Sequence, residues 1–350
     1  MANLTEIIKT ARPKSAESSI KAYNRLLNKM VLSHPMLVDD YNSMDWVKDT
    51  EFNFKTILGF GKGGEPPSDS TIRNYLVALM IYIEGINGGK ANEGEWSNYE
   101  YYKFYENKVT ELNDKLKKDK EANGLTTAQT EQFMDYKEFD KILDSMKKMA
   151  HKLMPKPSMG EGDNMKKQAL ETENYKYIMT YVLLKIYQEL NIRNEIATLI
   201  YITKRDYNKL KKQKQANKNY IINEKSKITI IRNQYKTSEV HKTIELQVSK
   251  NLTTLLRKWI AIDNLKSGDL FFKKLQPNEE AITSTPELNL TKFLQRQSEK
   301  YFNKKLSTTI LAKIYMSRPE NQTAQGLINA SNVRGTALNT LVPTYANSNN

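Results

Sequence analysis

The end of the chain contains a residue spacing with chemical potential, because Gly335 precedes Tyr345 by ten positions. A tyrosine hydroxyl is a weak nucleophile at neutral pH. It therefore reacts only when it is well positioned and the charge around its target is neutralised. Tyrosine is also common in this chain, at 20 of 350 residues. Taken alone, the spacing is better explained by a polar C-terminal tail without a catalytic role.

Two upstream segments carry basic residues in settings that suit phosphate chemistry. Arg193 follows a long apolar run and stands where the pattern predicts that another helix begins. Lys236 lies between two runs rich in β-branched residues, for which we expect a hairpin over residues 226–247. Considered separately, Arg193 is also explained as a surface arginine, and Lys236 as a solvated lysine at a turn.

In chain order, these segments resemble the sequence boxes of tyrosine recombinases. Residues 189–199 (ELNIRNEIATL) are similar to the first box, in which an arginine precedes a glutamate. The NQYKT segment at 233–237 is similar to the hairpin that carries the family's lysine, particularly in viral and mobile-element integrases. Residues 333–345 resemble the closing box, which ends at the tyrosine. Residues 12–27 and 68–85 are similar to the family's helical core-binding domain.

The resemblance implies a reaction and a role for each matching residue. Tyr345 would attack a DNA phosphodiester, Arg193 would bind the phosphate, and Lys236 would protonate the leaving 5′ oxygen. A guanidinium group matches the charge that spreads over phosphate oxygens in the transition state. The phosphotyrosine ester preserves the bond energy, so DNA integration or recombination by this route needs no metal, cofactor or ATP.

The second box departs from the family pattern of H-x-x-R. Thr309 and Ala312 stand at the histidine and arginine positions, and Thr336 replaces the usual His or Trp of the closing box. An arginine acting on a phosphoryl centre is worth about 10³–10⁵ in rate. Lys313 is a candidate substitute, although a neighbouring helical residue points about 100° away. Efficient catalysis is therefore in question, and the alternative is a non-enzymatic structural, packaging or regulatory DNA-binding protein on the same fold.

The charge of the chain favours a polyanionic partner. Lysine and arginine number 54 against 40 acidic residues, which gives a formal net charge of +14. We expect double-stranded DNA as the partner, contacted in the N-terminal part by a set of helix-face residues. These residues are Lys14, Lys21, Arg25 and Arg73. Ordinary solvated charge from an AT-rich coding sequence, on an unrelated basic helical interaction protein, would explain the same composition.

Several classes of site are not expected from this composition. The absence of cysteine excludes disulfides and thiolate metal sites. His34, His151 and His241 are far apart and lack ligand-like spacing, so we expect no metal and no cofactor. No apolar run approaches the length of a membrane span, and no signal peptide is recognised. We expect an intracellular protein, acting on host DNA or in a virion or viral factory, that assembles with itself on DNA.

The predicted fold is mainly α with a small β-sheet. We expect a helical core-binding domain over 1–153, a linker over 154–171 and a recombinase-like catalytic domain over 172–350, which together form a clamp around DNA. Apolar periodicity predicts a run of N-terminal helices at 14–33, 45–58, 71–85, 98–122 and 127–153. A buried helix follows at 172–190, and a further one is expected to open within 191–202. Helices return from 249 to 342.

Overall fold

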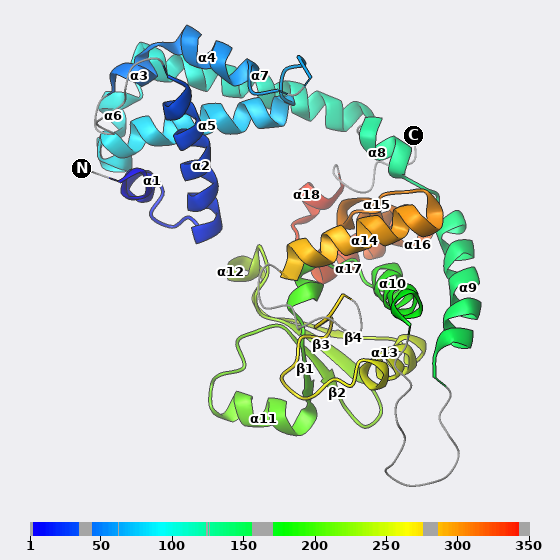
Figure 1. The fold of residues 1–350 in the computed structure, drawn as a ribbon. Helices are drawn as coiled ribbons and strands as arrows, with labels where there is room; N and C mark the ends of the chain where they lie inside the picture. Colours follow the sequence, from blue (N-terminus) through cyan, green and yellow to red (C-terminus); the bar gives the residue numbers. More distant parts are fainter. Residues whose placement is uncertain are drawn as a thin grey trace, which may run out of the picture. The chain divides into compact units, whose positions relative to one another are not determined.

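The computed structural model describes residues 3–34, 44–61, 63–123, 125, 127–155, 171–275 and 286–342. The chain divides into two compact units, Met1–Ala122 and Asn123–Asn350. Both units are mainly helical, and the second contains a small four-stranded mixed sheet (Figure 1), so the predicted fold class is confirmed. Most of the expected linker, residues 156–170, lies outside the described residues.

The boundary between the units falls at residue 122 and not at 153, because the helix α9 (Tyr136–Leu153) belongs to the second unit. Its buried side chains Phe139, Leu143 and Met146 share one core with the helix α10 (Thr172–Glu189). The apolar stripe on this segment predicted a helix correctly. A stripe does not reveal which core it joins, so the assignment of this helix to the N-terminal domain was wrong.

The first unit is built around the helix α5 (Asp69–Ile86). Ser68 begins it by accepting a hydrogen bond from the Thr71 amide. The helix is buried on several sides because α1, α2 and α4 pack against it. The remaining elements of the unit are α1 (Leu4–Ala11), α2 (Glu17–Ser33), α3 (Asp45–Lys48), α4 (Thr50–Leu58), η1 (Gly89–Asn92), α6 (Glu93–Trp96) and α7 (Glu100–Asn123).

Two predicted helices are each divided in the structure by an aspartate. The helix expected over 45–58 is interrupted at Asp49, whose carboxylate accepts from the Phe52 amide at 3.1 Å and starts α4. The helix expected over 127–153 is α8 (Thr127–Gln132) and α9, which begins after Asp135 accepts from the Lys137 amide. An aspartate at a helix start satisfies a free amide, so these side chains favour a new helix over continuation.

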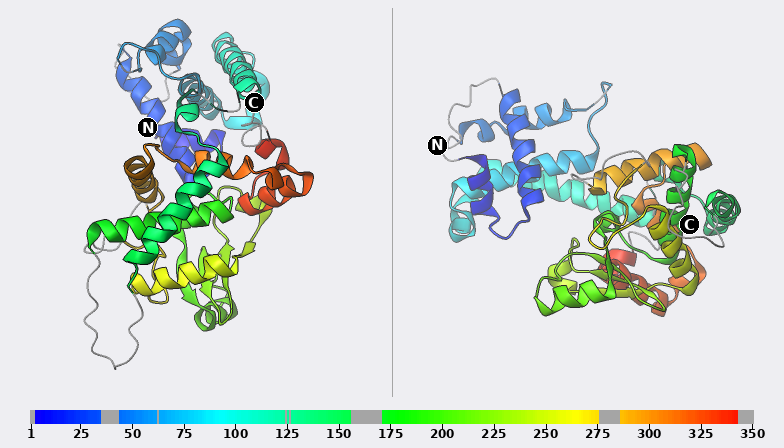
Figure 2. Two further views of the ribbon diagram at one scale, coloured as in Figure 1. Left: turned by 90° about the vertical axis from the view of Figure 1, so that its right-hand side faces the viewer. Right: turned by 60° about the horizontal axis from the view of Figure 1, so that its bottom comes forward.

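The second unit surrounds α10, which packs against α9, α13, α14 and α15. Figures 1 and 2 show α10 and the neighbouring α13 beside the sheet. The other helices of the unit are α11 (Lys204–Lys212), α12 (Ser238–His241), α13 (Lys250–Ile262), α14 (Pro286–Phe302), α15 (Thr308–Met316), α16 (Pro319–Gln322), α17 (Ala324–Arg334) and α18 (Leu338–Leu341). No helix of the described part of the chain is both long enough and apolar enough to cross a membrane.

The sheet has the order β1-β2-β3-β4. The strands β3 (Ile228–Arg232) and β4 (Ile244–Gln247) are antiparallel, which confirms the predicted hairpin. The strand β2 (Tyr220–Asn223) pairs antiparallel with β3 and parallel with β1 (Ile200–Thr203). A parallel pair needs a crossover connection, and here α11 supplies it.

Residues 191–202 do not form the predicted helix. A short 3₁₀ helix, η2 (Asn194–Thr198), is followed directly by β1. The Ile200 amide donates to the Asn219 carbonyl at 2.9 Å, and β-branched side chains suit the strand that results. The pairing partner lies 20 residues further along the chain, so local periodicity could not reveal it.

One buried carboxyl should make the stability of the second unit depend on pH. Asp263, at the end of α13, is 8% exposed and accepts a hydrogen bond from the Tyr175 hydroxyl at 2.9 Å. Burial raises the pKa of Asp263 to about 6, against an ordinary value of 3.8, although Lys273 and Lys274 favour the ionised form. Between about pH 4 and 6 the folded state therefore binds more protons than the unfolded state. Stability should fall as pH rises through that window and then level off.

Replacing Asp263 by asparagine should remove this dependence, because the amide oxygen still accepts from Tyr175 but cannot ionise. We expect Asp263→Asn to be more stable than the wild type above pH 6, by on the order of 2 kcal/mol after allowing for solvent screening. Urea unfolding of both proteins at pH 5.0 and 7.5 checks this. If the free energy of unfolding changed with pH equally in the two proteins, Asp263 would ionise in the folded state as it does in the unfolded state.

Candidate functional site

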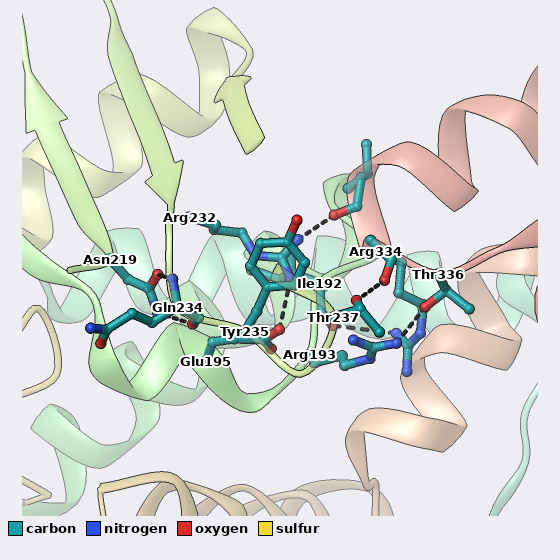
Figure 3. Close-up of polar contacts among 12 residues, drawn as sticks. Ile192, Arg193, Glu195, Asn219, Arg232, Gln234, Tyr235, Thr237, Arg334 and Thr336 are labelled. Atoms are coloured by element: carbon teal, nitrogen blue, oxygen red, sulfur yellow. Dashed lines mark hydrogen bonds and ion pairs between the residues drawn. The ribbon is translucent and has the colours of Figure 1, made fainter. Parts of the chain in front are cut away.

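Arg193 and Thr336 are in contact, although 143 residues separate them in the chain. Arg193 stands in extended conformation immediately before η2, and its Nη2 donates a hydrogen bond to the Thr336 hydroxyl oxygen (Figure 3). Thr336 is buried, whereas Arg193 is partly exposed. The structure thus brings Arg193 against Thr336, the position at which the closing segment departs from the family pattern.

The loop that carries Lys236 is attached to the same place. It connects β3 to β4, and the hydroxyl of Thr237 donates to the carbonyl oxygen of Gly335. The ring of Tyr235 lies close against Gly335, and its hydroxyl donates to the Lys242 carbonyl at 2.6 Å. Both flanking residues of Lys236 are therefore held, while Lys236 itself is exposed. The described parts of the three segments therefore meet within the second unit.

The base of this loop is fixed by Asn219, which the sequence analysis did not single out. Its side-chain oxygen accepts from the amides of Asn233 and Gln234, at 2.9 and 2.8 Å. Its side-chain nitrogen donates to the Gln234 carbonyl at 2.7 Å and to the Thr198 hydroxyl at 2.9 Å. One buried amide therefore links the start of the Lys236 loop to the end of η2.

A buried ion pair ties the three segments together. Arg232, the last residue of β3, is 2% exposed and donates to Glu195 at 2.7 Å. Its Nη1 donates to the Val333 carbonyl, and its guanidinium group lies 4.6 Å from the ring centroid of Tyr235. Arg232 thus connects η2, the hairpin and the end of α17 (Figure 3).

A second buried arginine holds the backbone that leads to Arg193. Arg334 is 2% exposed, and its Nη1 donates to the Asn191 side chain at 2.9 Å and to the Ile192 carbonyl at 3.5 Å. Sequence reasoning missed both Arg232 and Arg334 as parts of the site. Arg334 directly precedes Gly335, and this position was the available signal, but its burial could not be read from the sequence.

The site is electropositive. Arg193, Arg232 and Arg334 bring three guanidinium groups to this part of the fold, and the carboxylate of Glu195 pairs with Arg232. Of the three arginines, Arg193 alone is partly exposed, although its Nη1 is itself buried. A partly buried guanidinium beside a hydroxyl suits an anion with several oxygens, such as a phosphate.

The tyrosines beside this cluster do not replace the expected nucleophile. Burial raises the pKa of both Tyr187 and Tyr235, so their hydroxyls stay protonated at neutral pH. The Tyr235 hydroxyl already donates to a backbone carbonyl. Tyr345 lies outside the described residues, which end at Val342.

The segment expected to supply the second box forms α15, and Ser307 begins it by accepting from the Ile310 amide at 3.3 Å. Thr309 is half-buried on its first turn. Ala312 and Lys313 are both 3% exposed, and burial lowers the pKa of Lys313. The methyl group of Ala312 offers no hydrogen-bond donor, so this position cannot supply the charge that an arginine would.

The basic residues of the first unit that were expected to contact DNA differ in their exposure and in their contacts. Lys14, Lys21 and Arg25 are exposed, and Lys21 and Arg25 line a groove of about 610 Å³ along α2. Arg73 is half-buried and its Nε donates to the Asn113 side chain, which makes it partly structural. Lys29, on the same face of α2, lies 3.8 Å above the ring of Phe60.

In the part of the chain that the structure describes, no group of three or more His, Asp or Glu side chains could hold a metal ion. Comparison of the chain with protein-family models and with curated proteins finds no match. In the second unit, the candidate site consists of Arg193, Thr336 and the loop that carries Lys236.

Proposed function

We propose that the protein binds duplex DNA, with a backbone phosphate held against Arg193. The observation that carries the proposal is the convergence of three segments that are remote in sequence: Arg193, the loop 233–243 and Gly335–Thr336. These are the segments that resemble tyrosine recombinases. The net charge of +14 supports a polyanionic partner.

The chemistry of the site suits a phosphodiester. Arg193 offers a planar guanidinium group at a partly exposed position, and the ammonium group of Lys236 is exposed on a loop held at both sides. Buried partners hold the Arg193 backbone and the loop in place before a ligand arrives. Preorganised donors of this kind bind an anion without a large ordering cost.

The first experiment measures binding of a fluorescent 30-base-pair duplex by anisotropy over a series of KCl concentrations. Affinity should fall linearly on a log–log plot as salt rises, because binding releases counterions. Arg193→Gln should weaken binding about 10- to 100-fold, since a hydrogen bond between charged groups contributes about 1.5–3 kcal/mol. Unchanged binding by Arg193→Gln would contradict the proposed site.

Two controls separate phosphate contact from altered structure. Lys141→Gln removes an exposed positive charge on α9 and should leave the affinity nearly unchanged. Thr336→Val keeps the side-chain size but removes the acceptor of the Arg193 bond. Thr336→Val should weaken binding less than Arg193→Gln does, because Arg193 keeps its positive charge and loses only the contact that positions it.

Strand cleavage by Tyr345 is the second candidate function, and the contact between Arg193 and Thr336 favours it. Ala312 argues against efficient catalysis, because it supplies no donor. Nicked duplex DNA that traps a covalent protein–DNA adduct distinguishes the two functions. We expect salt-dependent binding without an adduct. An adduct that disappears in Tyr345→Phe would instead assign an active recombinase or integrase.

A further inference from the structure

The helix α11 and the loop that follows it present a concentration of positive charge that the Arg193 site does not use. We name it the α11 basic surface. It consists of exposed residues between β1 and β2: Lys204, Arg205, Lys209, Lys211, Lys212, Lys214 and Lys218. In Figures 1 and 2, α11 lies on the side of the sheet away from α10.

The fold forces these charges outward. Tyr207 and Leu210, three positions apart on one face of α11, pack against a small core that includes Ile202, Tyr220 and Ile222. The Tyr207 and Tyr220 rings meet edge to face with centroids 5.4 Å apart. The apolar face of the helix is therefore fully used in packing on the sheet, and its opposite face is left to the basic residues.

Few of these charges are neutralised by the protein. Lys204 pairs with Glu224 at 3.3 Å, and Lys209 pairs with Asp206 at 3.4 Å. Asp206 also accepts from the hydroxyls of Thr203 and Ser267, so it is shared among several donors. For the other members of the surface, the described residues provide no ion pair. These members are Arg205, Lys211, Lys212, Lys214 and Lys218.

Helix stability explains only some of this charge. Lysines in the last turn interact favourably with the helix dipole, which accounts for Lys211 and Lys212. Arg205 is in the first turn, where a positive charge is unfavourable. Lys214 and Lys218 lie beyond the helix, and Lys214 has a left-handed backbone with φ of 56° that turns the chain back beside the helix end. Binding of an anionic ligand would explain the positive charges of Arg205, Lys214 and Lys218, which the helix dipole does not explain.

We propose that the α11 basic surface binds the phosphate backbone of duplex DNA, as a contact separate from Arg193. Lysines suit phosphates as mobile point charges. The nine-residue helix is about 13 Å long, and a duplex carries about four phosphates of each strand over that length of its axis. The choice of DNA as the occupant rests on the proposed function.

Two other occupants fit the surface less well. An amphipathic helix that binds a membrane inserts its apolar face into the lipid boundary, but here that face is packed on the sheet. A protein partner would need an apolar centre in the interface, where lysine is depleted. The exposed face of α11 provides only lysine, arginine and asparagine.

The test compares two variants of the full chain that each lose four positive charges. The first variant carries Arg205→Gln, Lys211→Gln, Lys212→Gln and Lys214→Gln. The matched control carries Lys141→Gln, Lys147→Gln, Lys148→Gln and Lys152→Gln on α9, where all four lysines are also exposed. Each lost phosphate contact should lower the slope of log affinity against log salt by about 0.9.

We expect the α11 variant to lose about 2–4 from this slope and at least about tenfold in affinity at 0.15 M KCl, while its melting temperature is unchanged. The control variant on α9 should lose less than about 1 from the same slope. Equal slopes for the two variants, with wild-type binding intact, would overturn this inference alone. A wild-type protein that does not bind duplex DNA would overturn the proposed function as well. Loss of binding to phosphatidylserine vesicles in the α11 variant, with the DNA slope unchanged, would assign the surface to a membrane.

Discussion

Arg232→Met should lower the free energy of unfolding of the second unit by about 3–5 kcal/mol, the usual cost of breaking a buried ion pair from one side. Methionine matches the length of the arginine stem, so the change removes charge and hydrogen bonds more than volume. Glu195, whose side chain is 10% exposed, would keep its carboxylate without the guanidinium at 2.7 Å. The Val333 carbonyl would lose its donor too. Urea unfolding, followed by hydrogen exchange of the β3 amides, measures the change.

The double variant Arg232→Met with Glu195→Gln is the control for this result. Burying a neutral amide without a partner costs much less free energy than burying an unpaired carboxylate. The double variant should therefore recover part of the stability that Arg232→Met loses. If Arg232→Met cost less than about 1 kcal/mol, Glu195 would have access to water, and the ion pair would not hold the three segments together.

Gly335→Ala should cost about 2–5 kcal/mol, from two causes that the structure separates. Gly335 has a φ of 63°, a left-handed conformation that costs an alanine about 1–2 kcal/mol. A Cβ there would also lie 2.5 Å from Cε2 of Tyr235 and 3.1 Å from Cδ1 of Ile244, and such overpacking costs about 1–3 kcal/mol. The same displacement would move Thr336 relative to Arg193, so DNA affinity should fall as well.

Gly63→Ala provides a matched control, because Gly63 has nearly the same φ of 65° and a Cβ there meets nothing within 4 Å. It should show only the conformational cost. Urea unfolding of both variants therefore isolates the contact with Tyr235 as the difference between them. Equal losses would mean that the Lys236 loop moves aside without resistance, and the loop would then not be fixed against Gly335.

The elements that local chemistry specifies could be predicted from the sequence. The apolar spacing of α2, α5 and α10 matches helices in the structure. The β-branched runs on both sides of Lys236 match the strands β3 and β4. In each case neighbouring residues decide the outcome, since a helix repeats every 3.6 residues and a hairpin joins strands that are close in sequence.

The candidate site was only partly predictable. Arg193 and Lys236 were singled out from their order and surroundings, and Thr336 was named as a departure from the family pattern. The structure brings Arg193, Thr336 and the Lys236 loop together. Arg232 was overlooked, because an arginine at a strand end has no local feature that predicts burial. The roles of Lys236 and Tyr345 in strand cleavage stay predictions.

By itself, the sequence determined the charge of the protein, its mainly helical character, most helices and the hairpin, because these depend on composition and on contacts between near neighbours. The tertiary structure alone decided that α9 joins the second core, that residues 200–203 form a strand beside β2, and that Arg193 meets Thr336 across 143 residues. These outcomes depend on which distant surfaces pack together. Burial of apolar area and pairing of buried charges set that choice, and both are properties of the assembled core.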